Sequence, residues 1–406
     1  MMSSTCWVLL VFSAITFDEV GSITITASYP NGNTDSFRWR NLAVDPVTQM
    51  VYAGAVNRLL RLDDNLALIE STSTGPVQDN PECYSRLGEN PCLNADSNNV
   101  SSYPMDNFNQ ILVVDRKHQQ LVTCGNVFQG TCQTRSLTNL SLSMDYPSLP
   151  LSQYVIVASR TYPTVSFVGP GPFGDDVLYV GTAYPGKANT EWFLARYLAG
   201  VSSRNLTGPG TFLVTEDNDR TTYGTYGTRV ILTQEAANKY RINYVAGFSL
   251  KGFSYFLTTQ PEPFNLSIIS DVITSKLVQV CQDDKYFDSY VETRIICNIS
   301  GVDYNLIQAA AFIQPGTTLA KDLGLTVNDY VLLGIFSTSS QSNFGSAVCI
   351  YPLSDIRRIF TQNIQKCYNS SNGQVLVGPQ FVGSNRPCQA SLVSALLVLN
   401  RSIVMF

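Results

Sequence analysis

The sequence predicts an all-β protein of the propeller type. Short alternating apolar segments, broken by Gly, Pro, Asn and Asp, run through the whole chain, as in folds built of many short strands. A weak internal repeat combines an apolar strand, a polar turn and a second strand that ends in small residues. Repeated units that each form a small antiparallel sheet are typical of propellers, although here the period is longer and irregular.

The repeat is clearest in three places. Leu42–Asp45 is followed by Met50–Gly54, and Leu112–Asp115 is followed by Gln120–Gly125. A third copy lacks the aspartate of the first strand but keeps the second strand at Val177–Gly181. A further strand is expected after each of the first two copies, at 58–62 and 132–137.

Later segments fit the same scheme. We expect a hairpin over 244–260 with its turn at 250–252, and a second hairpin over 330–351 with a polar turn. Convincing long amphipathic helices are missing, and the best helical segments are short, at 319–325 and 353–360. We therefore count about five blades, and because no Pro-rich or Ser-rich linker divides them, we expect one domain.

Composition and charge narrow the class of protein. The chain has 406 residues, of which 44% are hydrophobic and 14% charged, with a formal net charge of −5. This charge argues against a nucleic-acid partner, which needs clustered Lys and Arg. The apolar stretch 6–17 is too short for a membrane span of ~20 residues. Val20 and Ser22 suit a signal-peptidase site, so we expect residues 1–22 to be a cleaved signal peptide.

The cysteines and glycosylation motifs also suggest secretion. Nine cysteines follow residue 22, a number typical of disulfide-bonded secreted chains, and no spacing resembles a zinc site. Nine is odd, so one thiol has no intramolecular partner. We expect glycans at the Asn-x-Ser/Thr motifs, which are Asn99, Asn139, Asn205, Asn265, Asn298, Asn369 and Asn400.

Several motifs in the chain are long enough to indicate a protein family. The segment at 40–83, which reads RNLAVDPVTQMVYAGAVNRLLRLDDNLALIESTSTGPVQDNPEC, is similar to the first blade of plexin sema domains. Its residues Thr74-Gly75-Pro76, and Cys83-Tyr84-Ser85 at its end, favour plexins over semaphorins, which have the same fold. The resemblance continues through CG to GTC at 124–132, GFSLKGFSYFLTTQ at 247–260, VQVCQDDKYFDSYVE at 278–292, YNLIQAAAFIQPGTTLAKDLGL at 304–325 and SAVCIYPLSDI at 346–356. We therefore expect a sema domain over 23–388.

The resemblance implies a sema-type seven-bladed β-propeller, incomplete here. It also implies four disulfide pairs, which are Cys83 with Cys92, Cys124 with Cys132, Cys297 with Cys349, and Cys367 with Cys388. Cys281 remains unpaired, because the family's partner cysteine would follow Cys388 and is absent.

Residues 389–406 are expected to be an apolar tail outside the family. We interpret this tail as the product of a truncated gene model, an unspliced intron or an alternative end. The alternative is a short isoform that folds without closing the propeller. Because an open ring leaves strand edges unpaired, we expect the chain to associate or to be poorly soluble.

The resemblance further implies an extracellular receptor domain that binds a semaphorin-like protein and acts in cell-surface signalling. Candidate contact residues, chosen because aromatic and charged loop residues are the usual anchors of an interface, are Tyr184, Trp192, Glu216 and Asp217. Trp192 could instead be buried in its own blade. The chain would be secreted as a fragment or lie at the cell surface within a longer receptor, and sema domains could also pair with one another.

The sequence leaves two alternative functions open. One is a secreted, truncated decoy that binds semaphorin or receptor. The other, more remote, is a propeller hydrolase. Catalysis has little support, because the single histidine, His118, lies in a polar turn where we expect it to be exposed. We expect no enzyme activity, no cofactor, no metal and no small-molecule substrate.

Overall fold

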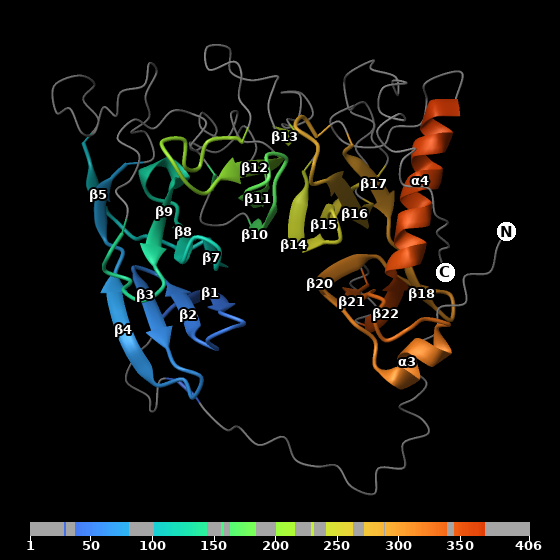
Figure 1. Cartoon of the computed structure of the whole chain (residues 1–406), viewed down its shortest axis with the longest axis horizontal. Helices are drawn as coiled ribbons and strands as arrows, with labels where there is room; N and C mark the ends of the chain where they lie inside the picture. The colour runs from blue at the N-terminus through green and yellow to red at the C-terminus, as the bar shows by residue number, and fades with distance from the viewer. Residues whose placement is uncertain are drawn as a thin grey trace, which may run out of the picture. The chain divides into compact units, whose positions relative to one another are not determined.

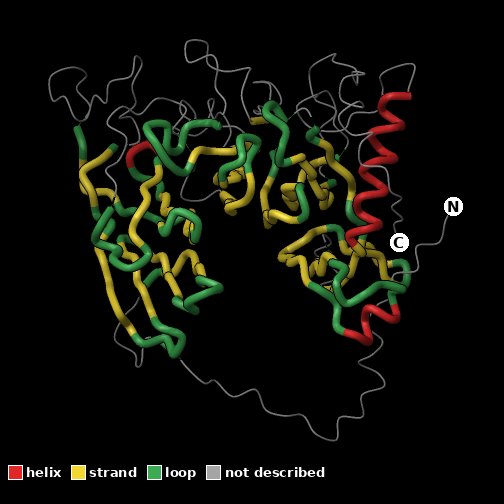
Figure 2. Tube along the Cα trace, viewed as in Figure 1, coloured by secondary structure: helices red, strands yellow, loops and turns green. Residues whose placement is uncertain are grey.

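The structure is a computed structural model of the 406-residue chain. It describes residues 28–29, 37–80, 101–143, 156–157, 163–183, 200–215, 229–230, 241–262, 272–287, 289–338 and 345–369. Two compact units are present: 19–229 forms one, and 230–406 together with 1–18 forms the other. Figure 1 labels the elements, and Figure 2 shows that strands predominate among them.

The unit formed by 19–229 contains three sheets of the expected repeat, each an antiparallel meander. The first sheet is β1 (Trp39–Val44), β2 (Val51–Ala55), β3 (Arg58–Leu62) and β4 (Leu68–Ser73). The second is β7 (Ile111–Asp115), β8 (Gln120–Cys124) and β9 (Cys132–Ser136). The third is β10 (Thr164–Pro170), β11 (Asp176–Thr182), β12 (Val201–Asn205) and the short β13 (Arg229–Val230), at which the chain leaves this unit. A ribbon of β5 (Val77–Asp79) and β6 (Tyr103–Met105) and a 3-10 turn η2 (Phe128–Gly130) complete it.

Alternation of apolar side chains explains why these sheets pack face to face. Tyr52 and Leu59 of the first sheet form one buried cluster with Leu112 and Leu121 of the second. On its other side the second sheet contributes Ile111, Val122 and the two half-cystines to a cluster with Leu178 and Val180 of the third sheet. Successive sheets therefore share cores, as successive blades of a propeller do.

The other unit contains two larger sheets and a small hairpin. The fourth sheet is β14 (Asn243–Leu250), β15 (Phe253–Pro261), β16 (Ile273–Cys281) and β17 (Val291–Arg294). The fifth is β20 (Leu306–Ile313), β21 (Val331–Ser337) and β22 (Ser346–Pro352), and the hairpin is β18 (Cys297–Ile299) with β19 (Val302–Tyr304). The described residues thus contain five sheets of three or four strands, which agrees with the expected number of blades.

Both later hairpins are confirmed. β14 and β15 join through Lys251 and Gly252, whose φ values of 47° and 84° give the tight turn expected at 250–252. β21 and β22 pair in register from Val331↔Pro352 to Ser337↔Ser346, as expected for the second hairpin.

The expectation about helices was partly wrong. α3 (Thr317–Asp322) is short, as predicted, but α4 (Leu353–Asn369) extends well beyond residue 360. No Gly or Pro interrupts it, and Ile356, Phe360 and Ile364 recur every four residues, so one apolar stripe packs against the core of this unit. The polar run 361–363 hides this continuation in the sequence. Among the described residues, no helix is both long and apolar enough to cross a membrane.

Candidate functional site

The four candidate contact residues, Tyr184, Trp192, Glu216 and Asp217, lie outside the described residues. Their described flanks belong to the third sheet. Tyr184 and Trp192 fall between Ala183, just after β11, and Gly200, just before β12. Glu216 and Asp217 directly follow Thr215.

Hydrogen bonds place all of these flanks at one end of the third sheet. The Thr182 amide donates to the Gly200 carbonyl at 2.9 Å, so the two ends of the segment 184–199 are joined. After β12 the chain folds back along it, and the Thr215 amide donates to the Ser203 carbonyl at 3.0 Å. The side-chain oxygens of Ser203 and Thr215 are 2.8 Å apart. The described flanks of both segments that carry candidate contact residues therefore lie at the same end of the sheet. We call this end, formed by Thr182, Gly200, Ser203 and Thr215, the third-sheet rim.

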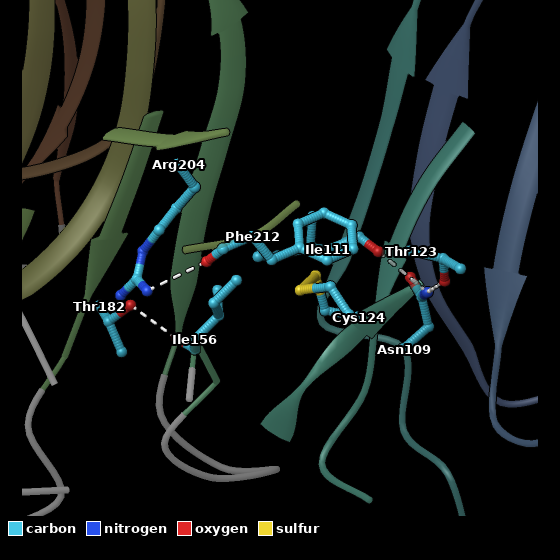
Figure 3. The surroundings of a disulfide bond; sticks show 9 residues. Asn109, Ile111, Thr123, Cys124, Ile156, Thr182, Arg204 and Phe212 are labelled. Atoms are coloured by element: carbon cyan, nitrogen blue, oxygen red, sulfur yellow. Dashed lines mark hydrogen bonds between the residues drawn. A yellow bond between two sulfur atoms is a disulfide. The ribbon is translucent and has the colours of Figure 1, made fainter. Parts of the chain in front are cut away.

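A disulfide lies beneath this rim. The sulfur atoms of Cys124 and Cys132 are bonded, and both residues are buried against Ile156, Leu178 and Phe212 (Figure 3). This bond closes a loop in the second sheet, and in that loop the Gly130 carbonyl accepts hydrogen bonds from the amides of Ile156 and Val157, at 3.1 and 3.0 Å. The Ile156 carbonyl in turn accepts from the Thr182 hydroxyl at 2.9 Å. The crosslinked loop is thus connected to the rim by consecutive hydrogen bonds.

A buried arginine also supports this region. Arg204 in β12 is 2% exposed, and its guanidinium donates to the Ser202 hydroxyl at 3.0 Å and to the Phe212 carbonyl at 3.3 Å (Figure 3). It therefore holds the returning segment 211–215 against the sheet.

An arginine recurs at the equivalent strand of the other two sheets, which we did not predict. Arg61 in β3 donates to the Leu137 carbonyl at 3.1 Å, and Arg135 in β9 donates to the Leu140 carbonyl at 2.7 Å. All three arginines are in the third strand of their sheet and bind a loop carbonyl. The signal was present in the sequence as LLRL, QTRS and SSRN.

A set of charged residues lies at the turn between the first two strands of each of the first three sheets. We call this set the charged-turn cluster. It consists of Asp45, Asp115, Arg116, Lys117, His118, Asp175 and Asp176. Arg116 reaches Asp45 of the first sheet at 2.9 Å, and Lys117 reaches Asp175 of the third at 2.5 Å. The side chains of Asp45 and Asp115 are 1% and 0% exposed, so both carboxylates must be fully hydrogen-bonded.

The aspartate of the sequence repeat caps its own turn. Asp45 accepts from the Val47 amide at 3.0 Å and the Thr48 hydroxyl at 2.5 Å. Desolvation alone would raise the pKa of Asp45, but the hydrogen bonds from Thr48 and Val47, together with Arg116, hold it below its ordinary value. A hydrogen bond and ion pair from Lys117 likewise lower the pKa of Asp175.

The expectation that His118 is exposed was wrong. Its side chain is 17% exposed, and both ring nitrogens face carboxylate oxygens. The turn itself was predicted correctly, but the sequence could not show that Asp175 would approach from the third sheet, more than fifty residues away. Because Asp115 and Asp175 flank the ring on its two nitrogens, neither nitrogen is open to a substrate from which it could take a proton.

A second buried polar group lies in the fourth sheet. Glu292 accepts hydrogen bonds from Gln260 at 2.6 Å and Tyr290 at 2.5 Å, and its carboxylate is 3.5 Å from the Lys276 ammonium. Burial raises the pKa of Glu292 and lowers that of Lys276. Because both carboxylate oxygens are occupied by neighbouring side chains, this arrangement fits a structural ion pair better than a catalytic acid. Among the described residues, no group of His, Cys, Asp and Glu side chains could hold a metal ion.

The other cysteines divide into three cases. Cys297 is bonded to Cys349 of β22, which fixes the hairpin β18–β19 to the fifth sheet. Cys281 is a free thiol, and burial raises its pKa to about 11. The side chains of Cys83, Cys92, Cys367 and Cys388 lie outside the described residues, as do those of Asn99, Asn265, Asn369 and Asn400.

Comparison with known proteins agrees with the resemblance. Residues 307–401 match the family model of the Sema domain. Human Plexin-A2 is 31% identical over 380 residues, covering 91% of this chain, and human Plexin-A3 is 30% identical over 402 residues, covering 95%. The chain spans about a fifth of the length of these relatives (19% and 20%). The Sema match extends to residue 401 and so includes part of 389–406, where we expected no family resemblance.

Solved structures show the same relationship. The full extracellular region of Plexin A4 superposes with a TM-score of 0.72 at 29% identity, covering 86% of this chain and 38% of that one. Drosophila Semaphorin 1a, at 19% identity and a TM-score of 0.51 over 92% of this chain and 65% of that one, supports the fold alone. With the five antiparallel sheets, these matches confirm the predicted all-β, propeller-type fold class. The chain therefore carries a sema domain of the plexin type.

Proposed function

We propose that this chain is the extracellular ligand-binding domain of a plexin-like receptor, and that it binds semaphorin-like proteins in cell-surface signalling such as cell guidance, adhesion and migration. The main support is the similarity to plexins along about nine tenths of the chain, at 31% identity to Plexin-A2. Two disulfides and the shared cores of successive sheets provide the rigid frame that a loop-borne binding surface needs.

The third-sheet rim is the proposed contact surface. Both segments that carry Tyr184, Trp192, Glu216 and Asp217 depart from it, and the Cys124–Cys132 loop and Arg204 support it from below. Aromatic side chains flanked by charged ones are the usual anchors of protein interfaces. We therefore expect these four residues to contact the ligand.

The test is binding of the purified chain to immobilised semaphorin ectodomains by surface plasmon resonance. We expect Trp192→Ala to weaken binding about 30-fold or more, the effect of losing a ~2 kcal/mol anchor. Trp39→Ala is the matched control, because Trp39 is 42% exposed on the first sheet, away from the rim. Equal affinities for the two variants would remove Trp192 from the surface, and no binding to any semaphorin would contradict the proposed function.

We assign the domain no catalytic role. His118 and Glu292, the two described groups most suited to acid–base chemistry, have their polar atoms occupied by neighbouring side chains. The measurement is turnover of peptide, ester and glycoside substrates by the chain and by a Glu292→Gln variant. Turnover that disappears in the variant would favour the hydrolase alternative.

We also propose that the chain is secreted after cleavage at residue 22 and is glycosylated. Asn139 is exposed and its side-chain oxygen accepts from the Ser141 amide at 3.0 Å, which leaves its amide nitrogen accessible. The amide nitrogen of Asn298 instead donates to Asp303. Mass spectrometry after enzymatic deglycosylation of the secreted protein should therefore find higher occupancy at Asn139 than at Asn298. The same experiment tests the decoy alternative, because a decoy must appear in the medium and bind semaphorin there.

Association between copies of the chain is a further proposal. One face of the fifth sheet exposes Ile313, Ile335 and Val348 at 37%, 44% and 44%, and carries no charge on β21 or β22. In analytical ultracentrifugation we expect concentration-dependent association that Ile335→Lys with Val348→Lys abolishes. Val302→Lys is the control, because Val302 is 40% exposed on β19 instead. Association that survives the double substitution would exclude this face.

A further inference from the structure

The charged-turn cluster contains an arrangement that ligand binding does not explain. The turn between β7 and β8 carries three cationic or potentially cationic residues, Arg116, Lys117 and His118. Each of them reaches a carboxylate on the corresponding turn of a neighbouring sheet. The turns of three successive sheets are thereby linked by side chains of the middle one.

His118 occupies the central position of this cluster. Its Nδ1 is 2.7 Å from Asp115 Oδ2 on its own turn, and its Nε2 is 3.3 Å from Asp175 Oδ1 on the turn between β10 and β11. The Asp115 side chain is fully buried, whereas that of Asp175 is 49% exposed. The imidazole ring therefore bridges a buried carboxylate of the second sheet and a solvated carboxylate of the third.

The proton count of the ring decides how many of these contacts are hydrogen bonds. A neutral imidazole has one N–H and can donate to one carboxylate, whereas the imidazolium donates from both nitrogens. Histidine is the side chain whose unperturbed charge change lies between pH 5 and 8. We propose that His118 is a proton-controlled clamp that ties the β10–β11 turn to the β7–β8 turn more firmly at acidic pH. This inference goes beyond the proposed ligand binding and does not depend on it.

Geometry indicates which contact is lost when the ring is neutral. Asp115 Oδ2 is the closer acceptor, and Asp115 is further fixed by the Gln120 amide at 2.9 Å and the His118 backbone amide at 3.2 Å. The single proton of the neutral ring therefore stays on Nδ1. Nε2 then faces Asp175 as a bare acceptor, and the contact of His118 with the third sheet is lost.

The other charged groups around the ring set the size of the effect. Lys117 Nζ is 2.5 Å from Asp175 Oδ1 and 4.0 Å from Asp176 Oδ1, so it holds the third-sheet turn at every pH at which the lysine is charged. Arg116 is directed to Asp45 of the first sheet. The His118–Asp175 contact thus adds a pH-dependent link to the constant one made by Lys117. Replacing Lys117 should make the contribution of His118 easier to measure.

The experiment is amide hydrogen exchange of the whole chain at pH 5.5 and pH 8.0, with rates corrected for intrinsic exchange. The readout is protection of the turn 171–176, where the Gly171 and Gly174 amides are hydrogen-bonded. We expect protection about two- to fivefold higher at pH 5.5, the range for one partly exposed ion pair. His118→Gln should abolish the difference, and Lys117→Gln should preserve or enlarge it.

A second variant provides the same test if His118→Gln fails to fold. Asp175 is half exposed, so Asp175→Ala should fold, and it should lose the pH dependence because Nε2 then faces no side-chain acceptor. The β14–β15 turn at 250–253, which contains no histidine and no carboxylate, serves as the internal control. Equal protection at both pH values in the unsubstituted chain, or a pH difference that persists in Asp175→Ala, would overturn the proposal.

Discussion

Substituting Gly125 by alanine tests the packing that underlies the sequence repeat. Gly125 ends the second strand of the second sheet, and a Cβ atom there would lie 1.7 Å from Oδ1 and 2.7 Å from Cγ of Asn107. Asn107 cannot easily move away, because its backbone amide donates to Asn57 Oδ1 at 2.7 Å and its side chain donates to the Thr74 carbonyl at 3.0 Å. Gly54 meets Asn109 in the same way, with Oδ1 at 2.3 Å.

The magnitude follows from the two effects of the clash. Forcing an extra carbon into a packed site costs ~1–3 kcal/mol. Displacing the Asn107 side chain also breaks its bond to Thr74, which adds ~1 kcal/mol. We therefore expect Gly125→Ala to lower the free energy of unfolding of the 19–229 unit by about 2–4 kcal/mol.

The assay is urea unfolding followed by hydrogen exchange of amides in β7 and β8, which reports on this unit separately. Gly210→Ala is the control, because Gly210 lies in the same unit and the nearest atoms are 3.6 Å from the position where its Cβ would be. Removing the obstacle in the double variant Gly125→Ala with Asn107→Ala should recover part of the loss. If Gly125→Ala unfolds at the same urea concentration as Gly210→Ala, the reasoning is refuted.

Three further predictions concern titrating side chains. Folding lowers the pKa of Asp45, so this carboxylate stabilises the folded chain above its unfolded pKa, and the stabilisation is lost as the pH falls through the folded pKa. Asp45→Asn removes this contribution, so acid unfolding below about pH 4, measured by circular dichroism, should become less steep. Lys276→Met should destabilise its unit by about 3–5 kcal/mol in chemical denaturation, because it leaves the buried Glu292 carboxylate unpaired, whereas Lys276→Met with Glu292→Leu should recover most of that loss. The thiol of Cys281, with its pKa of about 11, should react with iodoacetamide at pH 8 far more slowly in the folded chain than in urea, and equal rates would show that the thiol is not shielded.

Local patterns were sufficient to predict much of the fold. The strands at 42–62 and 112–136, and the hairpins at 244–260 and 330–351, follow from alternation and turn residues, which are properties of neighbours in sequence. The length of α4 was underestimated because its buried stripe continues across three polar residues, and this becomes apparent only when Phe360 and Ile364 are seen on one face. Contacts between distant segments, such as His118 with Asp175 or Thr182 with Ile156, have no signature in the sequence.

In the candidate site, too, local features could be predicted from the sequence and contacts between distant segments could not. Resemblance to a family could suggest which segments carry contacts, but not which residues of the frame support them. The crosslinked loop 124–132, through its Gly130 carbonyl, and the segment 156–157 form one connected support for the rim. These two segments lie more than twenty residues apart in the sequence, so the sequence alone does not show that they meet. The third-strand arginines Arg61, Arg135 and Arg204 do not stand out in the sequence, because their common role depends on the carbonyl that each one binds.

The third copy of the repeat shows how divergence can be compensated in structure. In the first two copies the aspartate that ends the first strand, Asp45 or Asp115, caps its own turn from inside. The third copy has Pro170 at the end of β10 instead, and its turn is closed by the Gly171 amide bonded to the Asp175 carbonyl at 2.8 Å. This frees the Asp175 carboxylate to face outward, where it meets Lys117 and His118 of the preceding turn. In the third copy the carboxylate therefore belongs to the turn itself and links two sheets, whereas in the first two copies it lies at the end of the first strand and caps its own turn.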